Sequence, residues 1–226
     1  MVLPESISAS AQDYAKAVYA LEAHEGASVS TNDLAERLGV TPGSVSAMVR
    51  KLSDVGLVEH EPYHGVRLTA QGRRVALEVL RHHRLIELFL SEELGMSWDR
   101  VHAEAEVLEH VLSEDLEQLI AARLGDPTVD PHGDPIPTVE FGIDEPATRS
   151  LDELPLGASG RLVRVSDDPE MLRYLAGLGI ALGDRLEVVG RQPFGGPVFV
   201  RFGAQEHPIG GALARAMRIE TEEAIG

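Results

Sequence analysis

Apolar residues recur at helical spacing along the first half of the chain, and short alternating segments dominate its last third. Residues 10–25 predict an amphipathic helix. A second short helix follows Ser30 and a third runs from Thr41 to about Gly56, because Ser and Thr are favoured caps at helix N-termini. Two short helices across a turn that contains Gly39 predict a helix-turn-helix motif.

A hairpin pattern follows this motif directly. Residues 57–61 and 65–69 alternate on either side of a Pro-Tyr-His-Gly turn, so the segment predicts a winged helix. The face of the third helix carries small polar side chains with two cations behind them, which suits entry into the major groove and contact with phosphates. The candidate DNA contacts are Thr41, Ser44, Ser46, Arg50 and Lys51. The alternative is an ordinary surface helix and hairpin.

Two longer helical patterns and a β-rich region complete the chain. Helices are expected over residues 69–94 and 98–124, the second with an apolar stripe formed by Ala105, Leu108, Leu112, Leu116 and Leu119. A proline-rich connection follows at 125–137, and residues 138–155 show no periodicity. Strands at 161–165, 185–189 and 198–202, with one short helix near 170–177, predict a small β-barrel. The fold class is therefore mainly α with α+β parts.

Imidazoles and carboxylates cluster in the two longer helices. His102, Glu106, Glu109 and His110 fall within an arc of about 100° on an ideal helix, and His83 precedes Glu87 by one turn. Each residue alone is more often structural, but together their carboxylates are costly to cluster without a cation. The chain has no cysteine, so any metal must be held by nitrogen and oxygen. His132 stands apart and is interpreted as structural.

Composition and charge limit the possible functions. The chain has 226 residues, 43% of them hydrophobic, and a formal charge of −17, which argues against indiscriminate nucleic-acid binding. The charge is uneven, however, because only Arg50 and Lys51 are charged between Thr41 and Ser53. No stretch approaches the roughly 20 apolar residues of a membrane span, and the N-terminus lacks signal-peptide features, so a cytoplasmic protein is expected.

Six short motifs stand out along the chain: Asp13-Tyr14, Thr41-Pro42-Gly43-Ser44-Val45-Ser46, residues 82–87 (HHRLIE), residues 102–110 (HAEAEVLEH), residues 132–137 (HGDPIP) and Gly183-Asp184. In these motifs and in the order of its parts, nearly the whole chain resembles the diphtheria toxin repressor family of metal-dependent transcriptional regulators. This resemblance implies a winged-helix DNA-binding domain (1–74), a helical dimerisation and metal-binding domain with its proline-rich linker (75–147), and a C-terminal SH3-like β-barrel (148–226). A homodimer that binds double-stranded operator DNA follows from it.

The resemblance also implies up to two metal ions per chain. One site would use Asp13, Glu106, Glu109 and His110. A second would use His83, Glu87 and His102 with a ligand from the barrel, either Asp168 or Glu170.

The chemistry of these ligands indicates which ion is sensed. Iron-responsive members tend to place Met and Cys where Asp13 and Glu106 stand, so the hard oxygens here favour Mn²⁺, with Fe²⁺ as the alternative. Lys16 departs from the manganese pattern, which has an acid at that position.

The expected function is a metal-activated repressor that controls genes of metal-ion homeostasis, and not an enzyme. A metal-dependent hydrolase built on the same cluster is one alternative, but the chain has neither a His-Glu-x-x-His motif nor a nucleophile elbow. A winged-helix module whose acidic helix binds a protein partner without metal is another.

Overall fold

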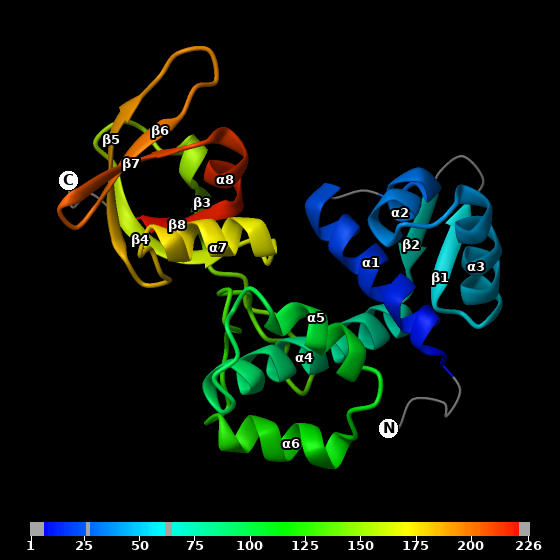
Figure 1. Cartoon of the computed structure of the whole chain (residues 1–226). Coiled ribbons are helices and arrows are strands. Elements are labelled where there is room, and N and C mark those ends of the chain that lie inside the picture. Colours follow the sequence, from blue (N-terminus) through cyan, green and yellow to red (C-terminus); the bar gives the residue numbers. More distant parts are fainter. Residues whose placement is uncertain (1–6, 26–27, 62–64, 222–226) are drawn as a thin grey trace. The chain divides into compact units, whose positions relative to one another are not determined.

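The computed structural model describes residues 7–25, 28–61 and 65–221 (Figure 1). The chain divides into two compact units. The first consists of Met1–His83, Val107–Glu117 and Pro137–Gly142, and the second of Arg84–Glu106, Gln118–Ile136 and Ile143–Gly226. The expected turn of the hairpin at 62–64 lies outside the described residues. None of the described helices is long and apolar enough to cross a bilayer.

The first unit contains the predicted winged helix-turn-helix. Ser30 caps the second helix by accepting a hydrogen bond from the Asp33 amide, and Thr41 caps the third by accepting from the Ser44 amide. Gly39 ends the second helix in the left-handed conformation, which glycine adopts without strain. The elements are α1 (Ala9–Glu25), α2 (Thr31–Leu38), α3 (Pro42–Asp54), β1 (Val58–Glu61) and β2 (Gly65–Leu68), with β1 and β2 antiparallel.

One apolar core holds these elements together. Val18 of α1, Leu34 of α2, Val45 of α3 and Val66 of β2 are all fully buried in it. Val29 also exchanges two backbone hydrogen bonds with Val66, which attaches the segment between α1 and α2 to the wing. The position of α1 is therefore tied to that of the predicted recognition helix α3.

The helix expected over residues 98–124 is two helices. After α4 (Ala70–Glu92) the chain forms α5 (Val101–Leu108) and α6 (Glu114–Arg123). Ser113 starts α6 by accepting from the Leu116 amide, and the Glu109 carbonyl accepts from His82 instead of continuing the α5 ladder. The prediction that four ligands share one helical face is therefore wrong, because Glu109 and His110 follow the end of α5.

The apolar stripe expected along that helix is also interrupted. Ala105 is buried, but Leu108, Leu116 and Leu119 are 40%, 48% and 68% exposed in the single chain. Exposed leucines in this number are typical of a surface that a partner covers.

The second unit contains a six-stranded antiparallel sheet in the order β3-β8-β4-β5-β6-β7. The three expected strands and the expected helix are present, and the segment 138–155, which has no periodicity, supplies the short strand β3. The elements are β3 (Arg149–Ser150), the 3₁₀ turn η1 (Leu151–Glu153), β4 (Ser159–Val165), α7 (Pro169–Gly177), β5 (Arg185–Arg191), β6 (Val198–Phe202), β7 (Gln205–Ile209), α8 (Gly211–Ala216) and β8 (Met217–Thr221). Figure 1 shows α7 and α8 beside this sheet.

The proline-rich loop docks on β4 within the second unit. The Val165 amide donates to the His132 carbonyl at 3.0 Å. Gly133, at a φ of +85°, lies so close to β4 that an added Cβ would be 1.9 Å from the Val163 carbonyl oxygen. The loop is therefore held in one position relative to the sheet.

Candidate metal centre

The first candidate metal group lies in the first unit. Asp13, Glu109 and His110 place one ligand atom each within 4.8 Å of one another. Asp13 is on α1, and the other two residues follow α5. The Nε2 of His110 is 2.8 Å from the Oδ1 of Asp13, and its Nδ1 donates to the Oε1 of Gln12 at 2.7 Å. The proton on Nδ1 leaves Nε2 as the nitrogen that can bind a metal.

The Glu109 side chain is fully buried and is held on both oxygens. Lys16 donates to Oε1 at 2.5 Å, and the Nδ1 of His83 pairs with Oε2. The Glu109 carbonyl accepts from the Nδ1 of His82 at 3.1 Å. The carboxylate and its backbone therefore have fixed positions beside α1 and α4.

A buried ionic cluster supports this arrangement. Glu117 of α6 accepts from Arg81 at 2.5 Å and pairs with the Nε2 of His82 at 3.2 Å. Burial lowers the pKa of His82, but its bonds to Glu117 and to the Glu109 carbonyl raise it by more, so the net pKa is raised. Burial raises the pKa of Glu117, but His82 and Arg81 outweigh it, so the net pKa is lowered. Both shifts favour the charged pair.

These distances suit a hard divalent ion. Octahedral ions with bonds of about 2.1–2.2 Å, between the values for Mg²⁺ and Ca²⁺, place adjacent ligands about 3 Å apart. The 2.8 Å between Asp13 and His110 needs little change to reach that value. Two carboxylates and an imidazole are donors that Mn²⁺ and Fe²⁺ accept.

A second candidate group lies wholly in the second unit. Glu87, Asp130 and His132 also bring their ligand atoms within 4.8 Å, and all three are buried. The Nε2 of His132 donates to the Trp98 carbonyl at 2.8 Å, which leaves Nδ1 facing Glu87 at 3.8 Å. His132 thus has the structural contact expected of it, and it also presents a nitrogen that can bind metal.

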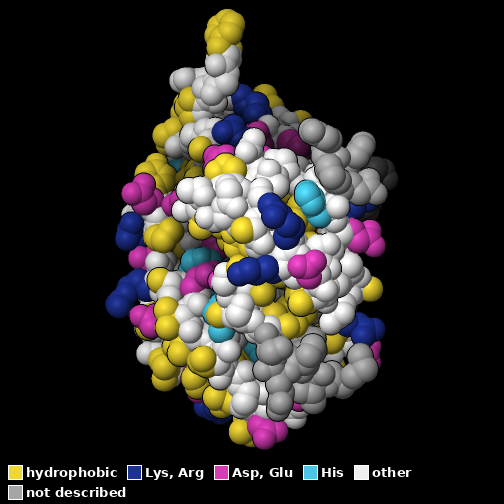
Figure 2. All heavy atoms as spheres, turned by 90° about the vertical axis from the view of Figure 1, so that its right-hand side faces the viewer, with side chains coloured by type: hydrophobic (Ala, Val, Ile, Leu, Met, Phe, Trp, Pro, Cys, Tyr) yellow, Lys and Arg dark blue, Asp and Glu magenta, His cyan; other side chains and the backbone are white. Residues whose placement is uncertain are grey.

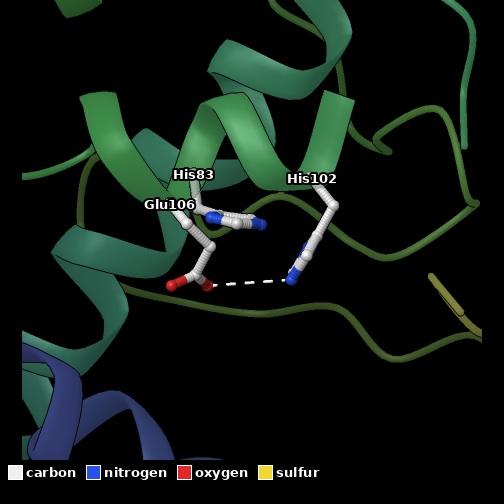
Figure 3. A group of neighbouring side chains, drawn as sticks. All are labelled: His83, His102 and Glu106. Atoms are coloured by element: carbon white, nitrogen blue, oxygen red, sulfur yellow. Dashed lines mark ion pairs between the residues drawn. The ribbon is translucent and has the colours of Figure 1, made fainter. Parts of the chain in front are cut away.

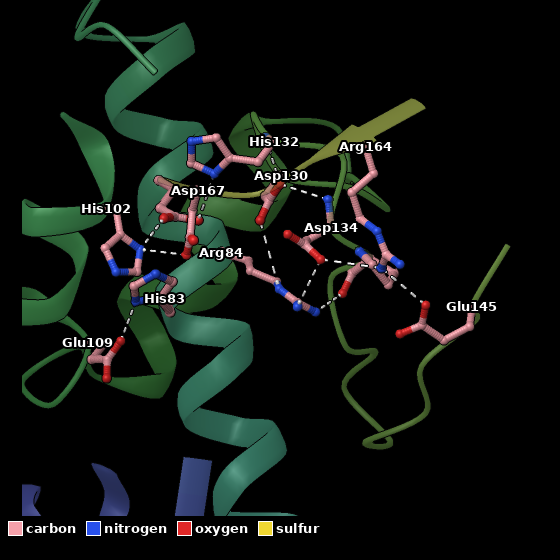
Figure 4. A network of polar contacts seen from close by, with 12 residues as sticks. His83, Arg84, His102, Glu109, Asp130, His132, Asp134, Glu145, Arg164 and Asp167 are labelled. Carbon is pink, nitrogen blue, oxygen red and sulfur yellow. Dashed lines mark hydrogen bonds and ion pairs between the residues drawn. The ribbon is translucent and has the colours of Figure 1, made fainter. Parts of the chain in front are cut away.

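The loop geometry explains why Asp130 is buried beside Glu87. Its Oδ1 accepts from the His132 amide at 2.8 Å and from the Asp134 amide at 2.9 Å. Its Oδ2 is 3.8 Å from Arg84, which also pairs with Asp134 (Figure 4). Arg164 of β4 joins the same network through Asp134 and Glu145.

Negative charge exceeds positive charge in this network. Burial, followed by the charges of Asp134 and Glu87, raises the pKa of Asp130 well above its usual range despite Arg84. Burial also raises the pKa of Asp134, against the lowering effect of Arg84 and Arg164. A divalent cation beside Glu87 and Asp130 would compensate the excess, so the donors of the second group fit such an ion.

His102 contacts two carboxylates of the second unit. Its Nδ1 is 3.2 Å from Glu87 and 3.2 Å from Asp167, and its Nε2 is 3.8 Å from Glu106 (Figures 3 and 4). Figure 3 also labels His83, whose ring nitrogen pairs with Glu109 in the first unit.

The residues expected from the C-terminal domain are placed differently. Asp168 caps α7, because its Oδ1 accepts from the Glu170 and Met171 amides. Glu170 is exposed in the first turn of α7. Asp167, the residue before this cap, is therefore the acid of this segment that reaches His102.

The predicted DNA contacts lie on or next to α3. Thr41, Ser44, Arg50 and Lys51 are exposed, while the Ser46 hydroxyl is half-buried and donates to the Pro42 carbonyl. Within the described part of the chain neither Arg50 nor Lys51 pairs with an acid. Figure 2 views the molecule from the side of Figure 1 on which α3 is labelled. Lys and Arg side chains lie near the middle of that view, among mostly uncharged ones. Such a surface suits phosphate contact.

Three family models match successive parts of the chain. Residues 6–66 match the N-terminal DNA binding domain of iron dependent repressors, and residues 69–138 match their metal binding and dimerisation domain. Residues 149–221 match the FeoA domain, in agreement with an SH3-like fold.

Relatives of known function are similar over most of their length. The iron-dependent repressor IdeR of Mycobacterium tuberculosis is 33% identical over 220 residues, which are 92% of this chain and 95% of the relative. The diphtheria toxin repressor of Corynebacterium glutamicum is 32% identical over 93% of this chain and 95% of its own.

Solved structures are similar over the same length. A manganese-dependent transcriptional repressor in complex with manganese is 44% identical, with a TM-score of 0.88 over 94% of this chain and all of its own. The manganese regulator SloR is 30% identical, with a TM-score of 0.77 over 94% of this chain and 98% of its own.

Proposed function

Because this chain belongs to the diphtheria toxin repressor family of metal-dependent transcriptional repressors, which are DNA-binding proteins and not enzymes, we propose that Mn²⁺ is the ion that activates it. Its targets would be genes of metal-ion homeostasis. The observation that carries this proposal is the convergence of Asp13 from α1 with Glu109 and His110 beyond α5.

The first group would act by fixing α1. Asp13 lies on a helix that shares its core with α2, α3 and the wing, whereas Glu109 and His110 lie in a segment matched by the metal binding and dimerisation model. A bound divalent ion would place one positive charge centre in contact with all three ligands. The ligands would then hold α1 in one position, so that metal and operator DNA each strengthen the binding of the other. Glu106 is proposed as a further ligand on the resemblance alone.

The choice of Mn²⁺ rests on oxygen at Asp13 and Glu106, where iron-responsive relatives tend to place sulfur. Replacing both acids in Asp13→Met/Glu106→Cys should shift the response toward Fe²⁺, because a softer ion gains more from sulfur. Activation of DNA binding in anaerobic titrations is the measurement to use, since raw affinity follows the Irving–Williams order for any such site. Activation of the unmodified protein by Fe²⁺ at tenfold lower free metal than Mn²⁺ would make it an iron sensor.

The second ion would be held by Glu87, Asp130 and His132, whose buried ligand atoms converge in the second unit. His102 and Asp167 would orient Glu87 or complete its coordination, as their 3.2 Å contacts suggest. On the family resemblance alone, His83 is also proposed as a ligand of this second ion. This site would attach α4 to the proline-rich loop, and through that loop to β4.

Operator binding would use the exposed face of α3. Arg50 and Lys51 would contact phosphates, and Thr41, Ser44 and Ser46 would fix the register. We propose a homodimer formed by the helical domain, whose exposed leucines a second copy would cover, and a cytoplasmic location. The three matched segments support the domain division at 1–74, 75–147 and 148–226.

Calorimetry of the metal-free protein tests the proposal. Mn²⁺, Fe²⁺ and Zn²⁺ would be titrated separately, with and without DNA selected from a random library in the presence of Mn²⁺. Metal-dependent repression requires tighter Mn²⁺ binding when DNA is present, by the same factor as Mn²⁺ tightens DNA binding. Equal affinities with and without DNA would overturn it.

A further inference from the structure

Lys16 stands beside the first metal group and touches one of its ligands. It follows Asp13 by three residues on α1, and its ammonium is 2.5 Å from the Oε1 of Glu109. The Lys16 side chain keeps 18% of its surface exposed, while that of Glu109 has none. A cation from the chain itself therefore occupies a position next to an oxygen that a metal ion would need.

The burial of Glu109 explains why this contact matters. A carboxylate without solvent exposure is costly unless a positive charge and hydrogen bonds compensate it. Lys16 supplies the charge, and His83 binds the other oxygen. In the metal-free protein these two contacts hold the Glu109 carboxylate in place.

The residue type suits displacement. Lys16 and Lys51 are the two lysines of the chain, and every other basic position apart from histidine is arginine. An ammonium is a compact charge on a flexible stem, while a guanidinium would grip a carboxylate through two parallel bonds. With part of its surface already exposed, Lys16 is able to move its charge toward solvent when another cation approaches Glu109.

We propose that Lys16 is an internal counter-ion that competes with the metal for Glu109 and sets the metal concentration at which the first site fills. This inference rests on the proposed function of that site. An ammonium 2.5 Å from Oε1 repels a cation that approaches the same oxygen, so the ion binds there only as Lys16 withdraws its charge. The same charge disfavours a second ion next to the first.

The test is a Mn²⁺ titration of the full-length metal-free protein by calorimetry, with Mn²⁺ electron paramagnetic resonance as a check on stoichiometry. The binding step that Asp13→Ala removes identifies the first site. Lys16→Gln should bind Mn²⁺ at that step at least tenfold more tightly than the unmodified protein. Lys16→Arg should bind it no more tightly than the unmodified protein, and Arg215→Gln, at an exposed position on α8, should leave the affinity unchanged.

A second readout, thermal melting, does not depend on DNA. Without metal, Lys16→Gln should melt at a lower temperature than the unmodified protein, because Glu109 loses its counter-ion, and saturating Mn²⁺ should remove this difference. Lys16→Met, which keeps the apolar stem, is read in the same way if Lys16→Gln fails to fold.

Two failures are distinguishable. If the unmodified protein shows no binding step that depends on Asp13, the proposed metal site itself is wrong. If that step exists but the neutral variants at Lys16 bind Mn²⁺ equally or more weakly, the site stands and the role of Lys16 as a competitor is overturned.

Discussion

The Nδ1 of His102 lies 3.2 Å from the Oδ2 of Asp167, so the residue that follows the β4 segment by two positions reaches a histidine of α5 within the same unit. The next residue, Asp168, has a different task, because its Oδ1 caps α7. Two adjacent acids therefore differ in their contacts, because Asp167 reaches His102 whereas Asp168, which the family resemblance favours as a ligand, caps α7.

Substitutions at these two acids should affect different properties, metal binding for Asp167 and stability for Asp168. Asp167→Asn should weaken the Mn²⁺ binding step that Glu87→Gln removes and leave the melting temperature of the metal-free protein nearly unchanged. Asp168→Ala should lower the stability by about 1 kcal/mol through loss of the cap and leave that step intact. Calorimetry and thermal melts of both variants check this, and weaker Mn²⁺ binding in Asp168→Ala alone would reverse the assignment.

Gly133 should be indispensable for the position of the second group. Its φ of +85° strains any other residue, and an added Cβ would meet the Val163 carbonyl at 1.9 Å. Gly125 is a matched control, since its φ is +76° but nothing lies within 4 Å of an added Cβ. Gly125→Ala should cost about 1–2 kcal/mol of stability from backbone strain. Gly133→Ala should cost about 1–3 kcal/mol more and weaken Mn²⁺ binding, and equal losses in denaturant melts would contradict this.

Arg50→Ala and Lys51→Ala should each weaken binding to all DNA sequences. Removing one phosphate contact reduces the slope of log K against log salt by about 0.9, and this slope is the quantity to measure. Arg215→Ala, at an exposed position on α8, is the control and should leave the slope unchanged. Unchanged slopes in both α3 variants would place the phosphate contacts on another surface.

Local sequence signals predicted the winged helix well. Ser30, Thr41 and Gly39 act through short-range capping geometry, which depends on residues only a few positions away. The strands β7 and β8 are harder to predict, because β7 has mostly exposed residues and β8 pairs with β4 and β3, which are distant in sequence.

The helical spacing singled out Glu109 and His110 as candidate ligands, but it did not show which residues lie beside them. The break after α5 depends on His82 donating to the Glu109 carbonyl, a contact between distant segments that no periodicity reveals. Asp130 becomes a candidate ligand because the amides of His132 and Asp134 in the same loop hold its carboxylate beside Glu87. The motif at residues 132–137 (HGDPIP) linked this loop to the family, but the motif alone does not show that a residue of the loop could bind metal.

The central claim is that an ion between α1 and the segment after α5 controls DNA binding. His110 is the residue through which to test it, because its Nε2 faces Asp13 and its removal leaves the buried Glu109 with its Lys16 and His83 contacts. His207→Ala on β7 is the matched control, since His207 belongs to none of the candidate metal groups among the described residues.

The most direct measurement is the affinity of the metal-free and Mn²⁺-loaded forms for selected operator DNA, in the unmodified protein, His110→Ala and His207→Ala. Mn²⁺ should tighten DNA binding at least tenfold in the unmodified protein and in His207→Ala. In His110→Ala, with unchanged circular dichroism, Mn²⁺ should have no effect. Full Mn²⁺ activation of His110→Ala would contradict the account.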